Sequence, residues 1–469
     1  MSSRSAAATV EMVRRRSASA VEMAEQAIRR ITDRADLNAV VDFDPEEGLR
    51  RAQAVDRRLA DGEALPLAGL PVVVKDNIWV AGRRVTQGSL LFRDFVPDRS
   101  AVVVERLERA GAVIVGMGNT PEFACKGQTT NRVYGATRHP ADPALTPGGS
   151  SGGSAVAVAA GLVPAAIGTD GGGSGRRPPA HVGVVGFKPS FGALPYGPGF
   201  PEPFTGIATI APIARTVTDT ELLFEALVGP DLRDPDSAPL AGDRAGDARA
   251  LRIGVSPRFG FNAPVDDVVA AAFAAVVDAL DGAGYRLIDQ DPAWPAAATE
   301  EALMPLQHAG LAAIHGAAFR ATPDLFDPDV AAQIERGFAY DGPAVARARW
   351  LSHDIARAAA ACFGDVDFLI GPTVPCAAWA IERLGPETIG GAPVAPRAHA
   401  VFTPFFNHAL TPAISIPMGR TPAGLPLGLQ IVGARGQDRR VLQVAAAFER
   451  ILADAGLWAG LPVEEHGRA

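Results

Sequence analysis

Short apolar runs and amphipathic stretches follow one another along the N-terminal part of the chain. Residues 19–22 (Ser-Ala-Val-Glu) form a capping box, and Asp44 followed by Pro45 is typical of a helix start. Apolar runs of five or six residues are too short for helices and indicate buried strands. The pattern predicts helices at about 19–31, 44–62 and 102–111, and strands at about 70–77 and 112–116.

The same alternation continues to the C-terminus. Residues 218–221 indicate another capped helix, and residues 296–362 have a largely helical pattern with alanine-rich and arginine-rich faces. Further helices are predicted at about 155–160, 218–228, 265–280 and 440–453, and strands at about 162–167, 182–187, 251–255, 285–288, 367–370 and 413–417. Alternating strands and helices indicate an α/β protein in which helices cover a broad sheet.

We expect a single domain, 1–469, although this length would allow up to three. No proline- or serine-rich linker and no run of charge divides the chain, and its one polar, structure-poor stretch indicates a surface loop. The expected parts are N-terminal helices at 7–62, a core at 65–230, a surface loop at 231–250, a helical insertion at about 296–362, and a C-terminal sheet and helix at 365–455.

Composition narrows the class of protein. The net charge of −8 is spread along the chain, so we expect no nucleic-acid partner. Cys125, Cys362 and Cys376 are dispersed and lack CxxC spacing, which fits a cytoplasmic protein without zinc or disulfides. The first helix contains Glu11, which argues against a signal peptide, and the uncharged stretch 143–169 is too rich in glycine, serine and proline to span a membrane.

Lysine is rare in this chain. Lys75, Lys126 and Lys188 are the three lysines, against 41 arginines. A chain that favours arginine for surface charge keeps lysine where the side chain must be able to lose its proton. Lys75 ends an apolar strand that would carry its amine into the interior, whereas the alternative is an ion pair with Asp76. The sequence leaves both interpretations open.

Two glycine-embedded serine clusters, at 148–154 and 171–174, flank a predicted helix and strand. Glycine weakens both kinds of element, so its density indicates that bare backbone N–H groups or unusual dihedrals are needed there. N–H groups fixed beside a serine are typical of a site that stabilises an oxyanion next to a nucleophile. A flexible linker is disfavoured because the apolar flanks at 155–160 and 162–167 must be buried.

Three other catalytic patterns fit the sequence less well. Residues 149–153 match G-x-S-x-G, but that elbow follows a strand and residues 141–147 have a loop pattern. The lysine of a phosphate-binding P-loop is missing. None of the eight histidines, including His181 and His408, neighbours a serine in a recognisable pattern, so a packing or surface role is expected for them.

Longer motifs around these clusters resemble the amidase signature family, whose hydrolases use a serine–cis-serine–lysine triad. The resemblance extends over nearly the whole chain and implies an α/β fold with a large mixed central β-sheet covered on both faces by α-helices. The core at 65–230 would carry the catalysis, and the insertion at 296–362 would form the pocket. The motifs that carry it are residues 148–176, 183–189, 74–77, 121–124, 134–135, 214–217 and 424–433.

The resemblance assigns roles residue by residue. Ser174 matches the nucleophile, Ser150 the bridging serine after a cis Gly149–Ser150 bond, and Lys75 the base. The expected oxyanion hole consists of the backbone N–H groups of Gly171, Gly172, Gly173 and Ser174. The expected supporting hydrogen-bond positions are Ser151, Asp170 and Arg176.

The chemistry implied is acyl transfer without a metal or organic cofactor. A lysine acts as a base only when neutral, so its pKa must fall from ~10.4 to near 7, at a cost of about 4 kcal/mol that burial can impose. Ser150 would relay the proton of Ser174 to Lys75 and later return it to the leaving group. The implied partner is a small-molecule amide or carbamate, and a homodimer is left open because related enzymes often dimerise.

The chain departs from the family around the nucleophile, at Gly171, Gly175, Arg177 and His181. Family members commonly carry threonine, isoleucine, an apolar residue and an aromatic residue there. The two glycines predict a wider acyl pocket that admits anilides or aryl carbamates. For Arg177, contact with a polar substrate group and a structural ion pair are both open, and Arg177, Gly175 and His181 are candidate pocket residues.

Two alternatives to a small-molecule amidase remain. One is the glutamine-hydrolysing component of a tRNA-linked amidotransferase, in which the family places an acidic residue shortly before the segment matching Phe406-Asn407; residues 399–402 contain none. The other is a non-catalytic binding protein with the same fold. Amides, anilides, esters and carbamates share one acylation chemistry, so we expect the substrate to be set by pocket walls at 191–204 and 296–362.

Overall fold

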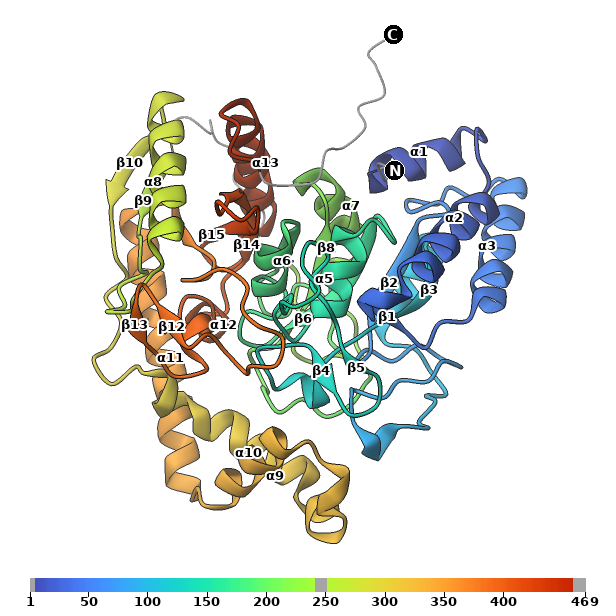
Figure 1. The fold of residues 1–469 in the computed structure, drawn as a ribbon. Helices are drawn as coiled ribbons and strands as arrows, with labels where there is room; N and C mark the ends of the chain where they lie inside the picture. Colours follow the sequence, from blue (N-terminus) through green and yellow to red (C-terminus); the bar gives the residue numbers. More distant parts are fainter. Residues whose placement is uncertain (1–4, 241–250, 459–469) are drawn as a thin grey trace.

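A computed structural model describes residues 5–240 and 251–458, and one mixed sheet runs through most of them (Figure 1). Its strand order is β1-β3-β2-β6-β8-β7-β14-β15-β11-β9-β10. The strands are β1 (Val40–Val41), β2 (Pro71–Lys75), β3 (Val113–Gly118), β6 (Ala165–Asp170), β7 (Val185–Lys188), β8 (Thr209–Ala214), β9 (Arg252–Val255), β10 (Arg286–Asp289), β11 (Phe368–Pro372), β14 (Ala413–Arg420) and β15 (Pro426–Gly433). Two small hairpins stand apart, β4 (Thr130–Asn131) with β5 (Gly135–Ala136) and β12 (Thr388–Ile389) with β13 (Ala392–Pro393).

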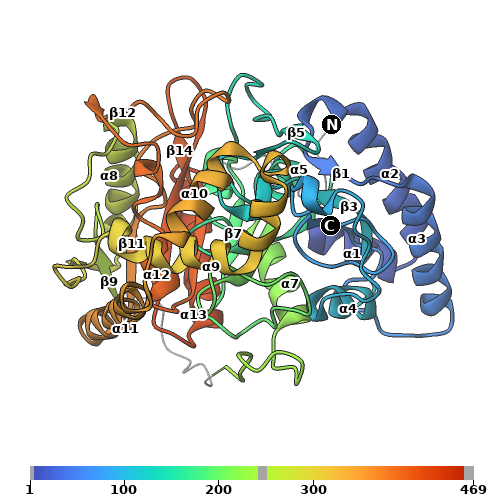
Figure 2. The ribbon, with the colours of Figure 1, turned by 90° about the horizontal axis from the view of Figure 1, so that it is seen from below.

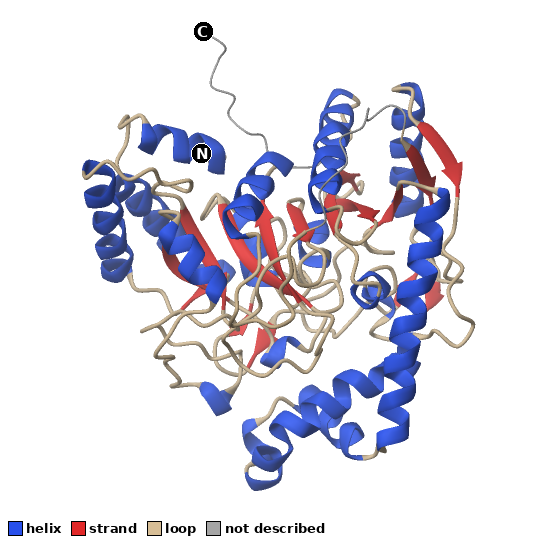
Figure 3. Cartoon of the chain, turned by 180° about the vertical axis from the view of Figure 1, so that it is seen from behind, coloured by secondary structure: helices blue, strands red, loops and turns tan. Residues whose placement is uncertain are grey.

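Helices cover both faces of the sheet, as Figures 1 and 3 show. Both α5 and α7 pack on β6 and β8. The helices are α1 (Ala6–Arg14), α2 (Ala20–Asp33), α3 (Pro45–Ala60), α4 (Val102–Arg109), α5 (Gly152–Ala159), α6 (Arg177–Val182), α7 (Val217–Leu227), α8 (Asp267–Gly282), α9 (Glu300–Ala321), α10 (Pro328–Phe338), α11 (Gly342–Asp365), α12 (Pro404–His408) and α13 (Asp438–Asp454). The prediction of an α/β fold with a large mixed sheet is confirmed.

The local signals act as expected in the N-terminal part. The Ser19 side chain accepts from the Glu22 N–H, and the Glu22 carboxylate accepts from the Ser19 N–H, which fixes the start of α2. One face of α2 is buried, at Ala20, Met23, Ala24, Ala27 and Ile31, the spacing of an amphipathic helix. Asp44 caps α3 in the same way by accepting from the Glu47 N–H.

Strand β2 lies between β3 and β6 and is parallel to both. Every residue of β2 is buried, as expected for a central strand with covered faces. Its last residue, Lys75, therefore enters the interior at the edge of the sheet where β6 also ends. The topology places the two glycine-serine clusters beside this strand end, because one precedes α5 and the other follows β6.

Some of the glycines serve close packing of α5. A Cβ on Gly153 would lie 2.2 Å from the Asn119 nitrogen, and a Cβ on Gly118 would lie 2.6 Å from Ser154 Oγ. Such distances leave no room for a side chain, so α5 contacts the end of β3 through bare backbone. Gly148 and Gly173 instead have positive φ values of 81° and 113°.

Several predicted boundaries are shifted. The strand expected at 162–167 begins at Ala165, because Gly161 turns the chain with φ of 72°. The strand expected at 182–187 is preceded by α6 and begins at Val185 after Gly183 with φ of 76°. The helix expected to be capped at 218 begins at Val217 with Thr216 as its cap. Strand β8 was not predicted, because its Pro212 interrupts the apolar run.

The expected helical insertion contains α9, α10 and α11. Figures 1 and 3 show α9, α10 and the lower part of α11 beneath the sheet, and the view from below shows α9 and α10 crossing its middle (Figure 2). Residues 231–240 of the expected surface loop contain neither helix nor strand, and residues 241–250 lie outside the described part, as do residues 1–4. Within residues 5–240 and 251–458, no helix combines the length and apolar character needed to cross a membrane.

Candidate active site

The amine of Lys75 lies in the protein interior and faces two hydroxyl groups. Its Nζ is 2.8 Å from Ser150 Oγ and 2.8 Å from Thr169 Oγ1, and the residue has no exposed surface. The alternative of an ion pair with Asp76 is wrong, because the Asp76 carboxylate accepts hydrogen bonds from Thr86 instead. Thr169, one residue before the end of β6, was not singled out from the sequence.

A hydrogen-bonded chain leads from this amine to the surface of a pocket. Ser150 Oγ donates to Ser174 Oγ over 3.0 Å, and the peptide bond between Gly149 and Ser150 is cis. Lys75 and Ser150 are fully buried, whereas Ser174 keeps 7% of its surface exposed. The three residues expected to form a triad are therefore in contact in the expected order.

Burial lowers the pKa of the Lys75 amine from 10.5 to about 7. The negative charges of Glu202 and Asp170 raise the pKa, and the positive charge of Arg177 lowers it, by smaller amounts. Near neutral pH a large fraction of the amine is thus uncharged. An uncharged amine 2.8 Å from a hydroxyl can accept its proton.

Asp170, at the end of β6, anchors the second glycine-serine cluster. Its carboxylate accepts from Arg176 Nε at 2.9 Å and Nη2 at 3.0 Å, a bidentate pair without solvent exposure. Burial by itself would raise the pKa of Asp170, but the charge and hydrogen bonds of Arg176 lower it well below its usual value. The Asp170 carboxylate is therefore held in its ionised form.

Residues of the C-terminal part complete this network. Asn407 Nδ2 donates to Asp170 Oδ1 at 2.9 Å, and Arg176 Nη1 donates to Gln430 Oε1 at 2.6 Å. Asn407 belongs to α12 and Gln430 to β15. Neither was predicted as a site residue, although Gln430 stands in the segment 424–433 that carries the family resemblance. In the sequence, the one sign of a role for Asn407 and Gln430 was an amide side chain within an apolar stretch.

The backbone N–H groups expected to form an oxyanion hole are not all free. The Gly173 N–H donates to Asp170 Oδ1 at 2.6 Å, and the Gly175 N–H donates to Asp170 Oδ2 at 3.1 Å. Within residues 5–240 and 251–458, no protein acceptor takes the N–H groups of Gly171, Gly172 or Ser174. Asp170 therefore shapes the loop, and three of the four expected donors remain available.

Ser151 joins the two clusters. Its hydroxyl donates to the Thr169 carbonyl at 3.1 Å and accepts from the Thr169 N–H at 3.3 Å. The Cβ that Gly168 lacks would lie 2.7 Å from Ser151 Oγ, so this approach requires a glycine. Ser151 thereby fixes the first cluster against β6, which agrees with the supporting position expected for it.

Ser174 opens into a pocket of ≈560 Å³, a volume suited to a small organic molecule. Gly172, Ser174 and Arg177 border it, and Phe204 together with α9 and α10 forms much of its wall. These walls fall within the two segments that the sequence indicated. Further walls come from residues 124–127 and 395–400, which the sequence did not indicate.

The departures from the family do not widen this pocket. Ala211 fills the space beside Gly175, where an added Cβ would lie 2.4 Å from the Ala211 Cβ, and Gly175 does not border the pocket. The Phe204 ring fills the space beside Gly171, at 3.1 Å. The prediction that the two missing side chains enlarge the acyl site is therefore corrected. Neighbouring side chains occupy both volumes.

Of the remaining candidate pocket residues, Arg177 borders the pocket and His181 does not. His181 packs edge-on against Trp379, with ring centroids 5.4 Å apart, and burial lowers its pKa to about 3. This agrees with the packing role expected for the histidines. Arg177 has no carboxylate within 4.0 Å in the described part of the chain, so the ion-pair alternative is not realised there.

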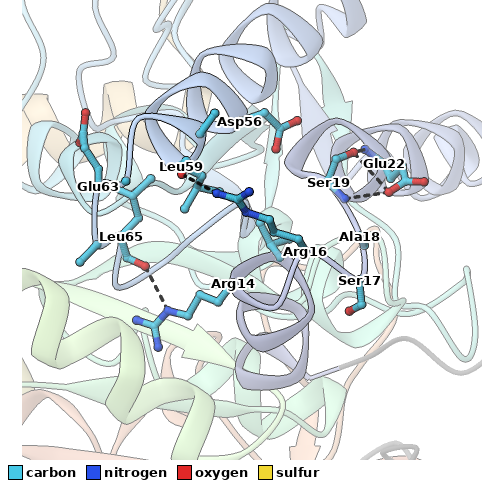
Figure 4. Close-up of a pocket in the computed structure, with 14 residues that line it drawn as sticks. Arg14, Arg16, Ser17, Ala18, Ser19, Glu22, Asp56, Leu59, Glu63 and Leu65 are labelled. Carbon is cyan, nitrogen blue, oxygen red and sulfur yellow. Dashed lines mark hydrogen bonds between the residues drawn. The ribbon is translucent and has the colours of Figure 1, made fainter.

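A second hollow, of ≈910 Å³, lies among α1, α2 and α3, away from these residues. Figure 4 shows its polar groups engaged with one another: Arg14 donates to the Leu65 carbonyl, Arg16 to the Leu59 carbonyl, and Ser19 pairs with Glu22. None of the candidate catalytic residues borders it. The chemistry of the site belongs to the pocket at Ser174.

Comparisons with known proteins bear on the fold and family of the chain. A family model described as Amidase matches residues 22–442. A glutamyl-tRNA(Gln) amidotransferase subunit of Ralstonia nicotianae is 37% identical over 92% of this chain and 94% of its own length. The crystal structure of a bacterial aryl acylamidase has a TM-score of 0.88 at 28% identity, over 98% of this chain and 99% of that one. A structure described as a vestigial protein complex that reveals the evolutionary origins of an s-triazine catabolic enzyme has a TM-score of 0.85 at 31% identity, over 97% of this chain and 99% of that one.

Replacing Arg176 by methionine would leave the Asp170 carboxylate buried without its counter-charge. Removing one partner of a buried pair costs about 3–5 kcal/mol, so we expect Arg176→Met to lower the free energy of unfolding by that amount. Chemical denaturation measures it. The control is Arg15→Met, which breaks an exposed pair with Glu11 and should cost less than about 1 kcal/mol. Equal losses in the two variants would contradict the anchoring role of the Asp170–Arg176 pair.

Proposed function

The chain belongs to the amidase signature family, and from this premise we propose that it hydrolyses the C–N bond of a carboxylic amide through an acyl-enzyme on Ser174. The observation that carries the proposal is the continuous hydrogen-bonded chain from Lys75 through Ser150 to Ser174. It joins a buried amine that is partly neutral at pH 7 to a hydroxyl on the pocket. Nucleophilic serines are activated in this way, by a base within hydrogen-bond reach.

In the proposed first step, Ser174 Oγ attacks the amide carbonyl. Its proton passes to Ser150, and the proton of Ser150 passes to the neutral Lys75 amine, so that the relay shifts one positive charge into the interior. The N–H groups of Gly171, Gly172 and Ser174, for which the described residues hold no acceptor, receive the developing oxyanion. Collapse of the tetrahedral intermediate breaks the C–N bond, and the proton returns through Ser150 to the leaving amine.

In the proposed second step, water enters the pocket and attacks the acyl-enzyme. Lys75 accepts the water proton through Ser150, the carboxylic acid leaves, and Ser174 regains its proton. The charged Asp170–Arg176 pair takes no part in proton transfer, because Asp170 stays ionised and both its oxygens hold the loop. Its role is to keep the glycine N–H groups in place between turnovers.

A serine-directed fluorophosphonate tests the nucleophile directly. We expect it to label Ser174, as identified by peptide mass spectrometry, and Ser174→Ala to abolish the labelling. Ser154→Ala is the matched control, because Ser154 belongs to the same serine-rich stretch but donates to the Ile167 carbonyl away from the pocket. An unlabelled wild-type protein would favour the non-catalytic binding protein instead.

The pH dependence of acylation tests the base. Because the pKa of Lys75 is lowered to about 7, the amine is protonated and inactive below that pH, so kcat/KM should rise through pH 7 and level off above it. Lys75→Met should lower kcat/KM by about 10²- to 10⁴-fold. Lys188→Met is the control, because burial also lowers the pKa of Lys188 to about 7 while its Nζ donates to the Pro189 carbonyl. If Lys75→Met kept its turnover and its kcat/KM still rose through pH 7, Lys75 would not be the base.

A glutamine-hydrolysing amidotransferase component is the second candidate, favoured by the 37% identity to such a protein. Against it, the stretch 399–402 contributes His399 and Ala400 to the pocket but no acidic residue. We expect the purified chain to hydrolyse anilides without a partner protein, and faster than it releases ammonia from L-glutamine. The reverse order, or activity that appears only with a co-purified partner, would support the amidotransferase.

A further inference from the structure

Arg177 carries a buried positive charge that makes no ion pair with the described residues, although the charges of Asp170 and Glu300 act on it from farther away. The residue is 7% exposed and borders the pocket beside Ser174. The one hydrogen bond of its side chain within the described residues is a long contact of 3.4 Å from Nη2 to the Gly149 carbonyl, and its Nε has no acceptor. Burying an unpaired charge lowers the free energy of unfolding, so we expect the charge of Arg177 to have a functional role.

The neighbouring cations do not share this property. Arg176, the preceding residue, is bound by Asp170, Asn407 and Gln430. Lys126 pairs with Asp327 at 2.6 Å, and Arg397 pairs with Glu300 at 2.5 Å. These three cations are thus paired, whereas Arg177, and Arg336 on α10, border the pocket without an ion pair among the described residues.

Two histidines add further unpaired nitrogens to the same pocket. His308 is 5% exposed and His399 is 3% exposed, and both border the pocket. The Nδ1 atoms of both rings lack a hydrogen-bond partner among the described residues. Burial lowers the pKa of both rings, so each is a neutral imidazole that can present one N–H. The Arg177 guanidinium therefore supplies donors without an acceptor, and His308 and His399 supply ring nitrogens that donate or accept according to the tautomer and have no partner among the described residues.

We propose that Arg177 binds a carboxylate of the substrate, so that the enzyme acts on amides that carry an acidic group close to the scissile bond. This inference rests on the proposed amide hydrolysis and specifies its substrate class. A guanidinium is planar and donates two parallel hydrogen bonds, which match the two oxygens of a carboxylate. A neutral carbonyl would satisfy the hydrogen bonds but would leave the charge unbalanced.

The position of Arg177 limits how far the acid can lie from the reacting carbonyl. Arg177 begins α6 three residues after Ser174, and its Cγ lies 3.2 Å from where a Cβ on Gly173 would stand. Its guanidinium contacts the Gly149 carbonyl, next to the bridging Ser150. The side chain thus lies along the catalytic loop itself, and a carboxylate bound to it belongs to a short substrate. His399 and His308 would take the remaining polar atoms of such a molecule.

Matched substrate pairs test the inference. One pair places the acid on the acyl side, N-phenylsuccinamic acid against N-phenylpentanamide, and the other places it on the leaving group, 4-acetamidobenzoate against 4-methylacetanilide. We expect the acid of at least one pair to exceed its neutral partner in kcat/KM by about tenfold or more. Arg177→Met should abolish this preference, mainly by raising KM for the acid, so that the acid-to-neutral ratio of kcat/KM falls to about one whatever the absolute turnover of the neutral amide. Arg177→Lys should restore part of the preference, because it keeps the charge but not the planar fork.

Three controls separate this inference from the proposed function. Fluorophosphonate labelling of Ser174 in Arg177→Met shows that the site is folded. A wild-type protein that is labelled and hydrolyses neutral amides but shows no preference for acids would overturn the inference and leave the amidase proposal standing. A wild-type protein that shows neither labelling nor any turnover would overturn the amidase proposal. Loss of the preference in Arg336→Met but not in Arg177→Met would move the anion site to Arg336 on α10 and also overturn the inference.

Discussion

The structure depends on the burial of one amine. Strand β2 runs between two parallel neighbours and delivers Lys75 into a site with no exposed surface, where desolvation lowers the pKa of the amine to about 7. The interior offers it hydroxyl groups, from Ser150 and Thr169, rather than a carboxylate in direct contact. A direct ion pair would have fixed the proton on the amine. Because the hydroxyl groups are neutral, they do not hold the proton on Lys75, and the lysine can act as a base.

A second buried group works in the opposite sense. Asp170 stands at the end of β6, close enough to raise the pKa of Lys75, yet its own charge is fixed by the bidentate contact with Arg176. The same interior therefore holds an amine with a pKa of about 7 and a carboxylate that stays ionised. The fixed pair orders the glycine loop and draws in Asn407 and Gln430 from the C-terminal part. Proton transfer and loop geometry are thus assigned to different residues, and Arg177 adds a charge that the protein leaves for a ligand.

Much of this could be predicted from the sequence, because the strongest signals are local. The apolar run before Lys75, the capping box at Ser19 and the density of glycine around Ser150 and Ser174 each determine short-range structure, and the family resemblance supplied the order of the triad. What could not be predicted depends on contacts between distant segments. The space beside Gly175 is filled by Ala211 from the unpredicted strand β8, so an absent side chain did not mean a larger pocket. Likewise, the sequence could not show whether Arg177 would have a carboxylate partner, because any segment that folds around it could supply one.

The protonation state of Lys75 tests the account most directly, and the scarcity of lysine makes it measurable. With ¹³Cε-labelled lysine, the NMR spectrum should contain signals from three side chains, and Lys75→Met identifies one of them by its loss. The account predicts that this signal titrates with a midpoint near pH 7 in the free protein. A Lys75 signal that stays in its protonated position to pH 9 and above would contradict the claim that burial supplies a neutral base, and with it the proposed mechanism.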